Sequence, residues 1–399
     1  PVNKRSWLCS SAFSGIGCPE VAAAAIRTAI GRDVLVFKFG IEGNQVARQL
    51  MQLHSPSCIL HLDIMDWLPL AFRQRVLGAS PETLRGIIFD RRANLSLHNA
   101  SMGTFSFGDL HVAGPPCIDF SPMGARQREA GPSMVGFYIW ARALRESAPM
   151  VVIIENVPRF PVALLESVFE DMYALDWVVI NATAFGAPGL RRRLYVVMTL
   201  RGKAKLSRPL KELCSLVAKI FTERRSWESL YCLAGVDDGM SAAVRRRARG
   251  YLRVFRDRNA IYDLDQLPTG RPRRALVGLL LFGLTANTKF CWSATFGRCL
   301  RRAELGASMG LPTHPAFACV YGAPVMSFEE LPRHAAGRVI GNGMSVPCVG
   351  SVLMWCLAYC VPDIESISAT IKEHPPGTLE ITEEPVVYTA MLADEHLIP

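Results

Sequence analysis

The sequence predicts an α/β protein in which a parallel β-sheet with flanking helices is followed by a smaller basic domain. Apolar strand-like runs alternate with helix-like segments over residues 1–200, which is typical of βαβ units. Basic segments replace this alternation from residue 201. The chain has 399 residues, enough for two domains, and its 50% hydrophobic and 20% charged residues indicate a globular protein.

Short apolar runs bounded by polar or turn residues predict the strands of the first domain. They are Leu8–Phe13, Val34–Phe39, Cys58–Leu62, Leu110–Ala113, Val151–Ile154, Val178–Asn181 and Leu194–Leu200. Helical spacing predicts helices over Val21–Ile30 and Val135–Ser147. Val151–Ile154 is apolar at every position, so we expect a strand that is buried on both faces.

The segments after residue 200 predict a second domain over residues 201–337. It begins with basic helical stretches, Leu210–Leu233 and Ser241–Asp257, and continues with a Pro, Gly and Arg-rich stretch at Leu267–Arg274. From residue 338 the chain becomes apolar again, and the helix-like Val349–Cys360 could return to the first domain. We therefore expect residues 338–361 to complete the domain of residues 1–200, and residues 362–399 to form a tail.

The positive charge of the chain is concentrated in one quarter of it. Residues 201–296 contain 19 Lys and Arg against 8 Asp and Glu, a net charge of +11, which leaves −2 for the remainder. Such a segregated basic region is expected of a polyanion-binding surface. The cluster Arg245, Arg246, Arg247 and Arg249 is the strongest candidate for phosphate contacts, and a solvated helix face is an equally good interpretation of it.

Cysteine usage and hydropathy exclude several classes of protein. The 12 cysteines stand in apolar contexts without a paired Cys-x-x-Cys zinc pattern, so we expect a reducing, intracellular location and no metal. The longest apolar run, Ala275–Leu284, has ten residues and suits a buried strand or helix better than a membrane span. The sequence starts at Pro1, so any targeting segment before it is not visible.

A glycine-rich turn and two acidic residues suggest a cofactor that contains adenosine. Phe13-Ser14-Gly15-Ile16-Gly17 lies between a strand and a helix, where glycines let backbone N–H groups approach a ligand. Glu42 follows the second strand, the usual place for a residue that holds ribose hydroxyls, and Asp63 follows the third. An ordinary strand-to-helix turn and a nicotinamide-binding turn are the alternatives.

Three further motifs carry reactive side chains. Cys117, in Gly114-Pro115-Pro116-Cys117, lies just past a strand and is a candidate nucleophile, although a structural cysteine is the alternative. Glu155 directly follows the predicted buried strand Val151–Ile154 and is either an ion-pair member or a functional acid. Arg191 and Arg193 precede the last strand and could hold a base or a phosphate.

The order of these motifs resembles the carbon-5 cytosine-specific DNA methyltransferase family. The resemblance runs from Phe13 to about Gly350, and includes Arg298–Pro312 with Glu304, and then Gly341-Asn342-Gly343. The spacing of Pro-Cys and Glu-Asn-Val is specific to the family, whereas the glycine turn is not. The resemblance implies a Rossmann-like S-adenosylmethionine-dependent methyltransferase fold with a smaller basic target-recognition domain.

The resemblance also implies a role for each matching residue. Cys117 would add to cytosine carbon 6, Glu155 would hold ring nitrogen 3, and Arg193 would contact the ring carbonyl with Arg191 nearby. The S-adenosylmethionine site would be formed by Phe13, Gly15, Gly17, Glu42, Asp63 and Asn342. The partner would be DNA, from which the target base is flipped, and the protein would be a monomer, nuclear if eukaryotic.

Three departures from the family pattern put the details of the site in doubt. Gly189 stands where the family has Gln, Gly343 where it has Ser, and Cys18 where it has Gly. The Cys-Phe-Thr motif of the RNA-methylating branch is absent, which favours DNA over RNA. An RNA (tRNA) cytosine-5 methyltransferase, a catalytically silent nucleic-acid-binding module and a nicotinamide-dependent dehydrogenase remain as alternatives.

Overall fold

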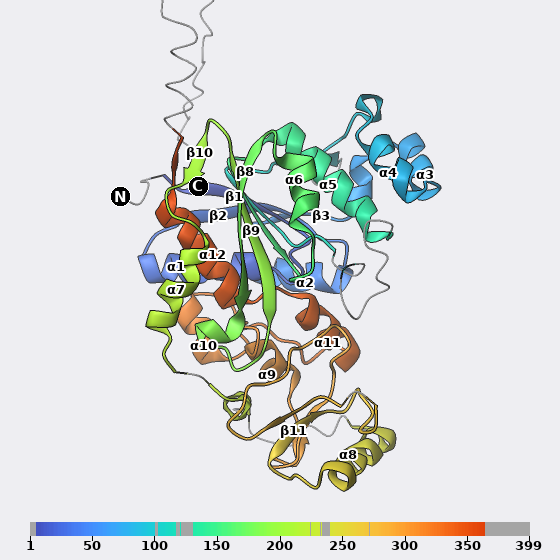
Figure 1. The fold of residues 1–399 in the computed structure, drawn as a ribbon, viewed down its shortest axis with the longest axis vertical. Helices are drawn as coiled ribbons and strands as arrows, with labels where there is room; N and C mark the ends of the chain where they lie inside the picture. Colours follow the sequence, from blue (N-terminus) through green and yellow to red (C-terminus); the bar gives the residue numbers. More distant parts are fainter. Residues whose placement is uncertain are drawn as a thin grey trace, which may run out of the picture.

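A seven-stranded sheet forms the centre of the larger domain in the computed structural model (Figure 1). The structure describes residues 5–99, 103–116, 120, 131–223, 225–231, 233, 240–270 and 272–363. The strand order is β3-β2-β1-β6-β7-β9-β8. The bounds are β1 (Trp7–Ala12), β2 (Leu35–Ile41), β3 (Ile59–His61), β6 (Leu110–Ala113), β7 (Val151–Asn156), β8 (Tyr173–Asn181) and β9 (Arg192–Leu200).

The sheet is mixed, so the expected parallel pairing does not extend to β9. Strands β1, β2, β3, β6 and β7 pair in parallel, whereas β9 pairs antiparallel with both β7 and β8. The segment between β8 and β9 is a short turn with one 3₁₀ helix, Ala182–Phe185. A connection of this length joins antiparallel neighbours, because a parallel pair needs a longer crossover.

Two hydrophobic cores lie on opposite faces of the sheet. In β7, Val151 and Ile153 belong to one core and Val152 and Ile154 to the other, as side-chain alternation requires. The first core contains residues of α1 (Cys18–Ile30), α7 (Lys211–Ile220) and α12 (Val346–Tyr359). The second core contains residues of α3 (Leu70–Leu77), α4 (Pro81–Ile88), α5 (Ser133–Ser147) and α6 (Val162–Phe169).

The C-terminal part of the described chain packs on the larger domain. Helix α12 packs on α1 and α7, and β15 (Cys360–Pro362) pairs with β10 (Ala204–Leu206). By length and composition, Arg333–Tyr359 is apolar enough to cross a membrane. However, 72% of the apolar stretch within it is buried inside the protein. Packing against α1 and α7 therefore accounts for the apolar character of α12.

A separate smaller domain lies at the lower end of Figure 1, around α8 and β11. Its sheet has the order β12-β11-β13-β14. The bounds are α8 (Ala242–Phe255), β11 (Ala260–Asp263), β12 (Arg274–Leu276), β13 (Cys291–Ser293) and β14 (Arg298–Cys299). Its core packs Val244 and Tyr251 of α8 against Tyr262 of β11.

Two expectations for the segments after residue 200 are corrected. The predicted helix Leu210–Leu233 ends at Ile220, and a separate 3₁₀ helix, Trp227–Leu230, follows. The run Ala275–Leu284 is not one buried element, because only its first two residues belong to a strand and Val277 and Leu279 are exposed. Gly278, at φ +79°, turns the chain between them.

Candidate active site

The candidate residues converge because parallel strands end at the same edge of the sheet. Phe13 follows β1, Glu42 follows β2, Asp63 lies two residues past β3, Gly114 follows β6, and Glu155 belongs to the end of β7. β1 pairs with β6 and β6 with β7, so the turn after β1 and the carboxylate of Glu155 are separated by a single strand.

The glycine-rich turn is tied to the end of β2. Phe13 N donates to Ile41 O over 2.9 Å, and Gly15 N donates to Glu42 Oε2 over 2.9 Å. Gly15, at φ +63°, and Gly17, at φ +80°, occupy the left-handed region that favours glycine, and Gly17 caps α1. Burial raises the pKa of Glu42, while the N–H groups of Gly15 and Asn44 act in the opposite direction.

A buried network lies behind this turn. Ser11 Oγ donates to Glu20 Oε1 over 2.6 Å and lies 3.1 Å from Ser14 Oγ. A Cβ added at Gly17 would lie 3.4 Å from Glu20 Oε2, which has no hydrogen-bond partner among the described residues. Burial raises the pKa of Glu20 to about 7. The sequence reasoning missed Glu20, although a carboxylate in the first turn of an otherwise apolar helix could have indicated it.

Glu155 is paired with Arg193 at the centre of the candidate site. Its side chain is 10% exposed, and Arg193 Nε lies 3.0 Å from Oε1. This ion pair lacks hydrogen-bond geometry, so Oε1 keeps no hydrogen-bond partner in the described part of the chain. A Cβ added at Gly114 would lie 3.9 Å from Glu155 Oε2 and 3.0 Å from Phe13 O. The carboxylate therefore lies beside the turns that follow β1 and β6.

Asn156 links the end of β7 to the loop that carries Cys117. Its Nδ2 donates to Pro115 O over 3.1 Å, and its Oδ1 accepts from Val157 N over 2.8 Å. Cys117 itself lies outside the described residues, so its position stays a prediction. Asn156 is only 1% exposed, and a buried amide must find partners. Its role in positioning the loop follows from the structure rather than from the motif alone.

Arg191 ties the last glycine turn to β9. The side chain is buried, and Nη1 donates to Gly341 O over 3.2 Å while Nη2 donates to Gly343 O. Burial lowers the pKa of Arg191 to about 10. Its hydrogen bonds thus hold the Gly-Asn-Gly turn in place, whereas its neighbour Arg193 pairs with Glu155.

The Gly-Asn-Gly turn lies against the glycine-rich turn that follows β1. Helix α11 (Arg333–Asn342) ends there, with Asn342 exposed, and a Cβ added at Gly15 would lie 3.7 Å from Gly343 Cα. Gly343 has φ −64°, and a Cβ there would meet Cys18 Sγ at 3.4 Å. The space and backbone at Gly343 would therefore accept the serine of the family pattern.

Asp63 follows β3 and is exposed. Its side chain accepts a hydrogen bond from Met65 N and so caps a 3₁₀ helix.

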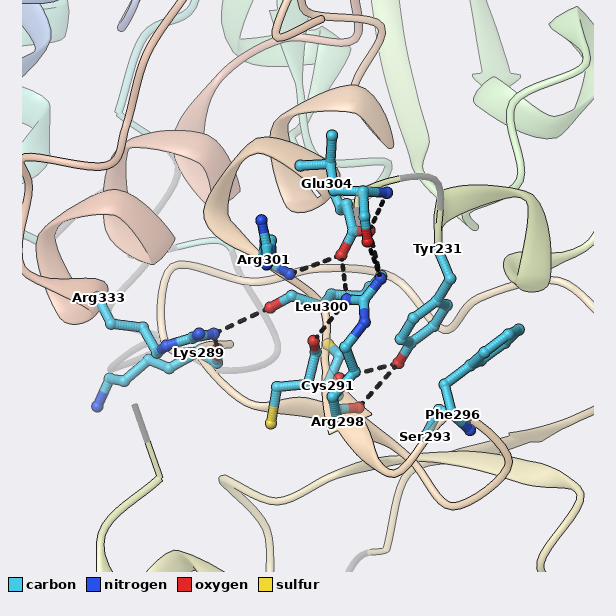
Figure 2. Close-up of polar contacts among 12 residues, drawn as sticks. Tyr231, Lys289, Cys291, Ser293, Phe296, Arg298, Leu300, Arg301, Glu304 and Arg333 are labelled. Atoms are coloured by element: carbon cyan, nitrogen blue, oxygen red, sulfur yellow. Dashed lines mark hydrogen bonds and ion pairs between the residues drawn. The ribbon is translucent and has the colours of Figure 1, made fainter. Parts of the chain in front are cut away.

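A buried ion pair organises the junction with the small domain (Figure 2). Glu304 is fully buried and accepts two hydrogen bonds from Arg298, of 2.7 and 2.8 Å. It also accepts from the backbone N–H groups of Arg301 and Leu233, and the Arg298 guanidinium lies 4.6 Å from the ring centre of Tyr231. Both carboxylate oxygens of Glu304 thus accept hydrogen bonds, so the motif at Arg298–Pro312 has a structural role.

The four arginines of the predicted cluster in α8 divide into two groups. Arg245, Arg246 and Arg249 are exposed, whereas Arg247 is half-buried and donates to Leu264 O. Arg247 lies three residues after the buried Val244, which places it beside the face of α8 that packs on the small-domain sheet.

In the described ranges, no three His, Cys, Asp or Glu side chains form a group that could hold a metal ion.

Part of the chain is similar to a known protein family. Residues 94–226 match the family described as C-5 cytosine-specific DNA methylase. The type II methyltransferase M.AquIA of Picosynechococcus sp. is 31% identical over 111 residues, which cover 24% of this chain and 45% of that protein. M.SacI of Streptomyces achromogenes is 32% identical over 107 residues, which cover 24% and 27%. The match thus spans less than half the length of these relatives.

Solved structures extend the likeness of the fold to most of the chain. The Schizosaccharomyces pombe Dnmt2 methyltransferase superposes with a TM-score of 0.56 at 13% identity, covering 88% of this chain and 98% of that one. The Entamoeba histolytica methyltransferase EhMeth superposes with a TM-score of 0.50 at 12% identity, covering 89% and 99%. The predicted α/β methyltransferase fold with a separate smaller domain is therefore confirmed.

Proposed function

We propose that this chain, which matches the C-5 cytosine-specific DNA methylase family over residues 94–226, methylates carbon 5 of cytosine in DNA. One observation carries this proposal. The Glu155 carboxylate, paired with Arg193 over 3.0 Å, lies next to Asn156, which holds the carbonyl of Pro115 two residues before Cys117. An acid, a cation and the residue that leads into the Cys117 segment, Pro115, thereby lie at one edge of the sheet.

The residues at the ends of β1 and β2 fit S-adenosylmethionine. Gly15 and Gly343 face each other without side chains, and the Glu42 carboxylate lies beside the glycine turn, where it can accept from ribose hydroxyls. Phe13, Gly17, Asp63 and Asn342 complete the proposed site. When bound, S-adenosylmethionine supplies an electrophilic sulfonium methyl group.

The chemistry of cytosine explains why these side chains are needed. Carbon 5 is a poor nucleophile, but addition of the Cys117 thiolate to carbon 6 would convert the ring to an enamine. Carbon 5 of that enamine could then accept the methyl group, with S-adenosylhomocysteine as the leaving group. Glu155 holds ring nitrogen 3, where charge develops, and Arg193 binds the ring carbonyl. Transfer of the carbon-5 proton to solvent water would then expel the Cys117 thiolate and restore the aromatic ring.

DNA suits the charge distribution of the small domain. The target base must leave the duplex to reach the edge of the sheet, and the protein must hold the backbone on either side of it. Arg245, Arg246 and Arg249 present positive charge on the outer face of α8, and we assign them to phosphate contacts.

A transfer assay with labelled S-adenosylmethionine tests the proposal. The protein is incubated with duplex DNA, single-stranded DNA or transfer RNA of matched cytosine content, and the product is digested to nucleosides. We expect label in 5-methyldeoxycytidine from duplex DNA, and none with Cys117→Ala. Preferential labelling of RNA would replace the DNA assignment, and label in another nucleoside or none at all would refute cytosine-5 methylation.

A further inference from the structure

A closed turn of the small domain presents an asparagine to solvent. Thr288 N donates to Thr285 O over 2.9 Å, and Thr285 N donates back to Thr288 Oγ1 over 3.0 Å. The two hydroxyls lie 3.0 Å apart, and Thr288 is buried. Asn287 occupies the third position of this turn and is exposed. In the part of the chain that the structure describes, its amide has no side-chain hydrogen bond.

Helix α11 is shaped to receive this turn. A Cβ added at Gly341 would collide with Thr285 O and would lie 2.6 Å from Ala286 N, and one at Gly337 would lie 2.6 Å from Thr288 O. Contacts that close leave room only for glycine, because the opposing atoms are backbone. One turn of helix earlier, Arg333 Nη1 donates to Lys289 O over 3.0 Å, as Figure 2 shows.

The other end of this helix is fixed to the candidate active site. Gly341 and Gly343 accept from Arg191, and Gly343 faces Gly15 of the cofactor turn. Arg191 stands two residues before Arg193, the partner of Glu155. A series of backbone and side-chain contacts therefore connects the turn at residues 285–288 with Arg193 and Glu155, the residues proposed to hold the target base.

We propose that Asn287 reads a base edge in the duplex next to the target cytosine, an inference that rests on the proposed function. An amide offers one donor and one acceptor side by side, the pattern that matches adenine in the major groove. A reading group must be held rigidly relative to the site it serves, and the turn at residues 285–288 is held in this way. In this proposal Asn287 contributes to sequence preference, whereas the arginines of α8 contact the phosphates.

The test compares the flanking preference of the wild type, Asn287→Ala and Asn259→Ala. Asn259 is an exposed asparagine of the same domain and provides the matched control. Each protein methylates a duplex pool in which the bases around one cytosine are randomised, and the methylated fraction is sequenced. Duplex binding is measured in parallel on the best and worst sites.

The expected result is a loss of about tenfold or more in discrimination at one flanking position with Asn287→Ala, within the range of a bidentate base contact. Most of this loss should come from a lower rate on the best site, by about tenfold, towards the rate on the worst site, whereas Asn259→Ala should keep both the wild-type rate and the wild-type preference. An unchanged preference, or a uniform loss of binding to all sequences, would overturn the inference while leaving the proposed function intact. A wild-type protein that methylates no cytosine in the pool would overturn both.

Discussion

Replacement of Glu155 by glutamine separates its chemical role from its structural one. The substitution keeps the shape of the side chain but removes the charge that lies 3.0 Å from Arg193 Nε. Breaking a fully buried pair costs about 3–5 kcal/mol. Because Arg193 is 21% exposed and also donates to Arg192 O over 2.8 Å, water and this carbonyl compensate part of the loss. We therefore expect a loss of about 1–2 kcal/mol in the free energy of unfolding.

The effect on catalysis should be larger than the effect on folding or binding. Charge at ring nitrogen 3 develops only along the reaction path, so the contact with Glu155 strengthens there. We expect a fall in kcat on the order of 100-fold, with the Kd for duplex DNA and for S-adenosylmethionine within about threefold. Single-turnover methylation measures the first quantity, and filter binding and calorimetry measure the others.

The matched control for this substitution is Glu212→Gln. Glu212 pairs with Arg208 over 2.8 Å on the exposed face of α7, and both side chains are more than a third exposed. Such surface pairs contribute little, so the methylation rate and stability of this variant should stay near the wild-type values. A Glu155→Gln protein that turns over normally but binds DNA weakly would refute the catalytic assignment and leave Glu155 as a structural ion-pair member.

Two further predictions concern the α8 surface and the buried carboxylate of α1. Neutralising Arg245, Arg246 and Arg249 together should weaken binding to all duplex sequences and reduce the log–log salt slope by up to about three units, whereas an unaltered slope would exclude this surface from phosphate binding. Arg247→Gln should instead lower stability, because its guanidinium donates to Leu264 O. Glu20 has a folded-state pKa of about 7 against an ordinary value of 4.5, so the folded protein retains a proton that the unfolded chain releases, and stability should fall by on the order of 3 kcal/mol between pH 4.5 and 7 and then level off. Glu20→Gln should unfold at a higher temperature than the wild type at pH 8 and at a more similar one at pH 5, and equal melting temperatures at both pH values would contradict this.

Much of the larger domain could be predicted from local pattern. The predicted strands Leu110–Ala113 and Val151–Ile154 are found in place, because apolar runs between turn residues leave few other structures open. Strand direction was missed, since nothing in the apolar pattern of β8 and β9 distinguishes a crossover from a hairpin. Strand β7 is two residues longer than predicted, and these two residues, Glu155 and Asn156, belong to the candidate site.

The site was predictable as a set of residues but not as a set of contacts. Asn156 to Pro115, and Arg191 to Gly341, join positions 41 and 150 residues apart, and no local pattern encodes such pairs. The partial burial of Arg247, unlike its exposed neighbours, could have been predicted, because it lies three residues after the apolar Val244 on the same side of the helix. The roles of Cys117 and of the cofactor residues stay predictions.

The most direct test of the central claim is covalent trapping on cytosine that carries fluorine at carbon 5. After thiolate addition and methyl transfer, the fluorine takes the place of the proton whose loss would release the enzyme, so the adduct should persist. We predict that wild-type protein with S-adenosylmethionine and a 5-fluorocytosine duplex forms a denaturation-resistant complex, whose cross-linked peptide contains Cys117. Cys117→Ala should form none while binding S-adenosylmethionine as the wild type does. Equal trapping by the alanine variant, or a cross-link at another residue, would contradict the assignment of Cys117 as the nucleophile.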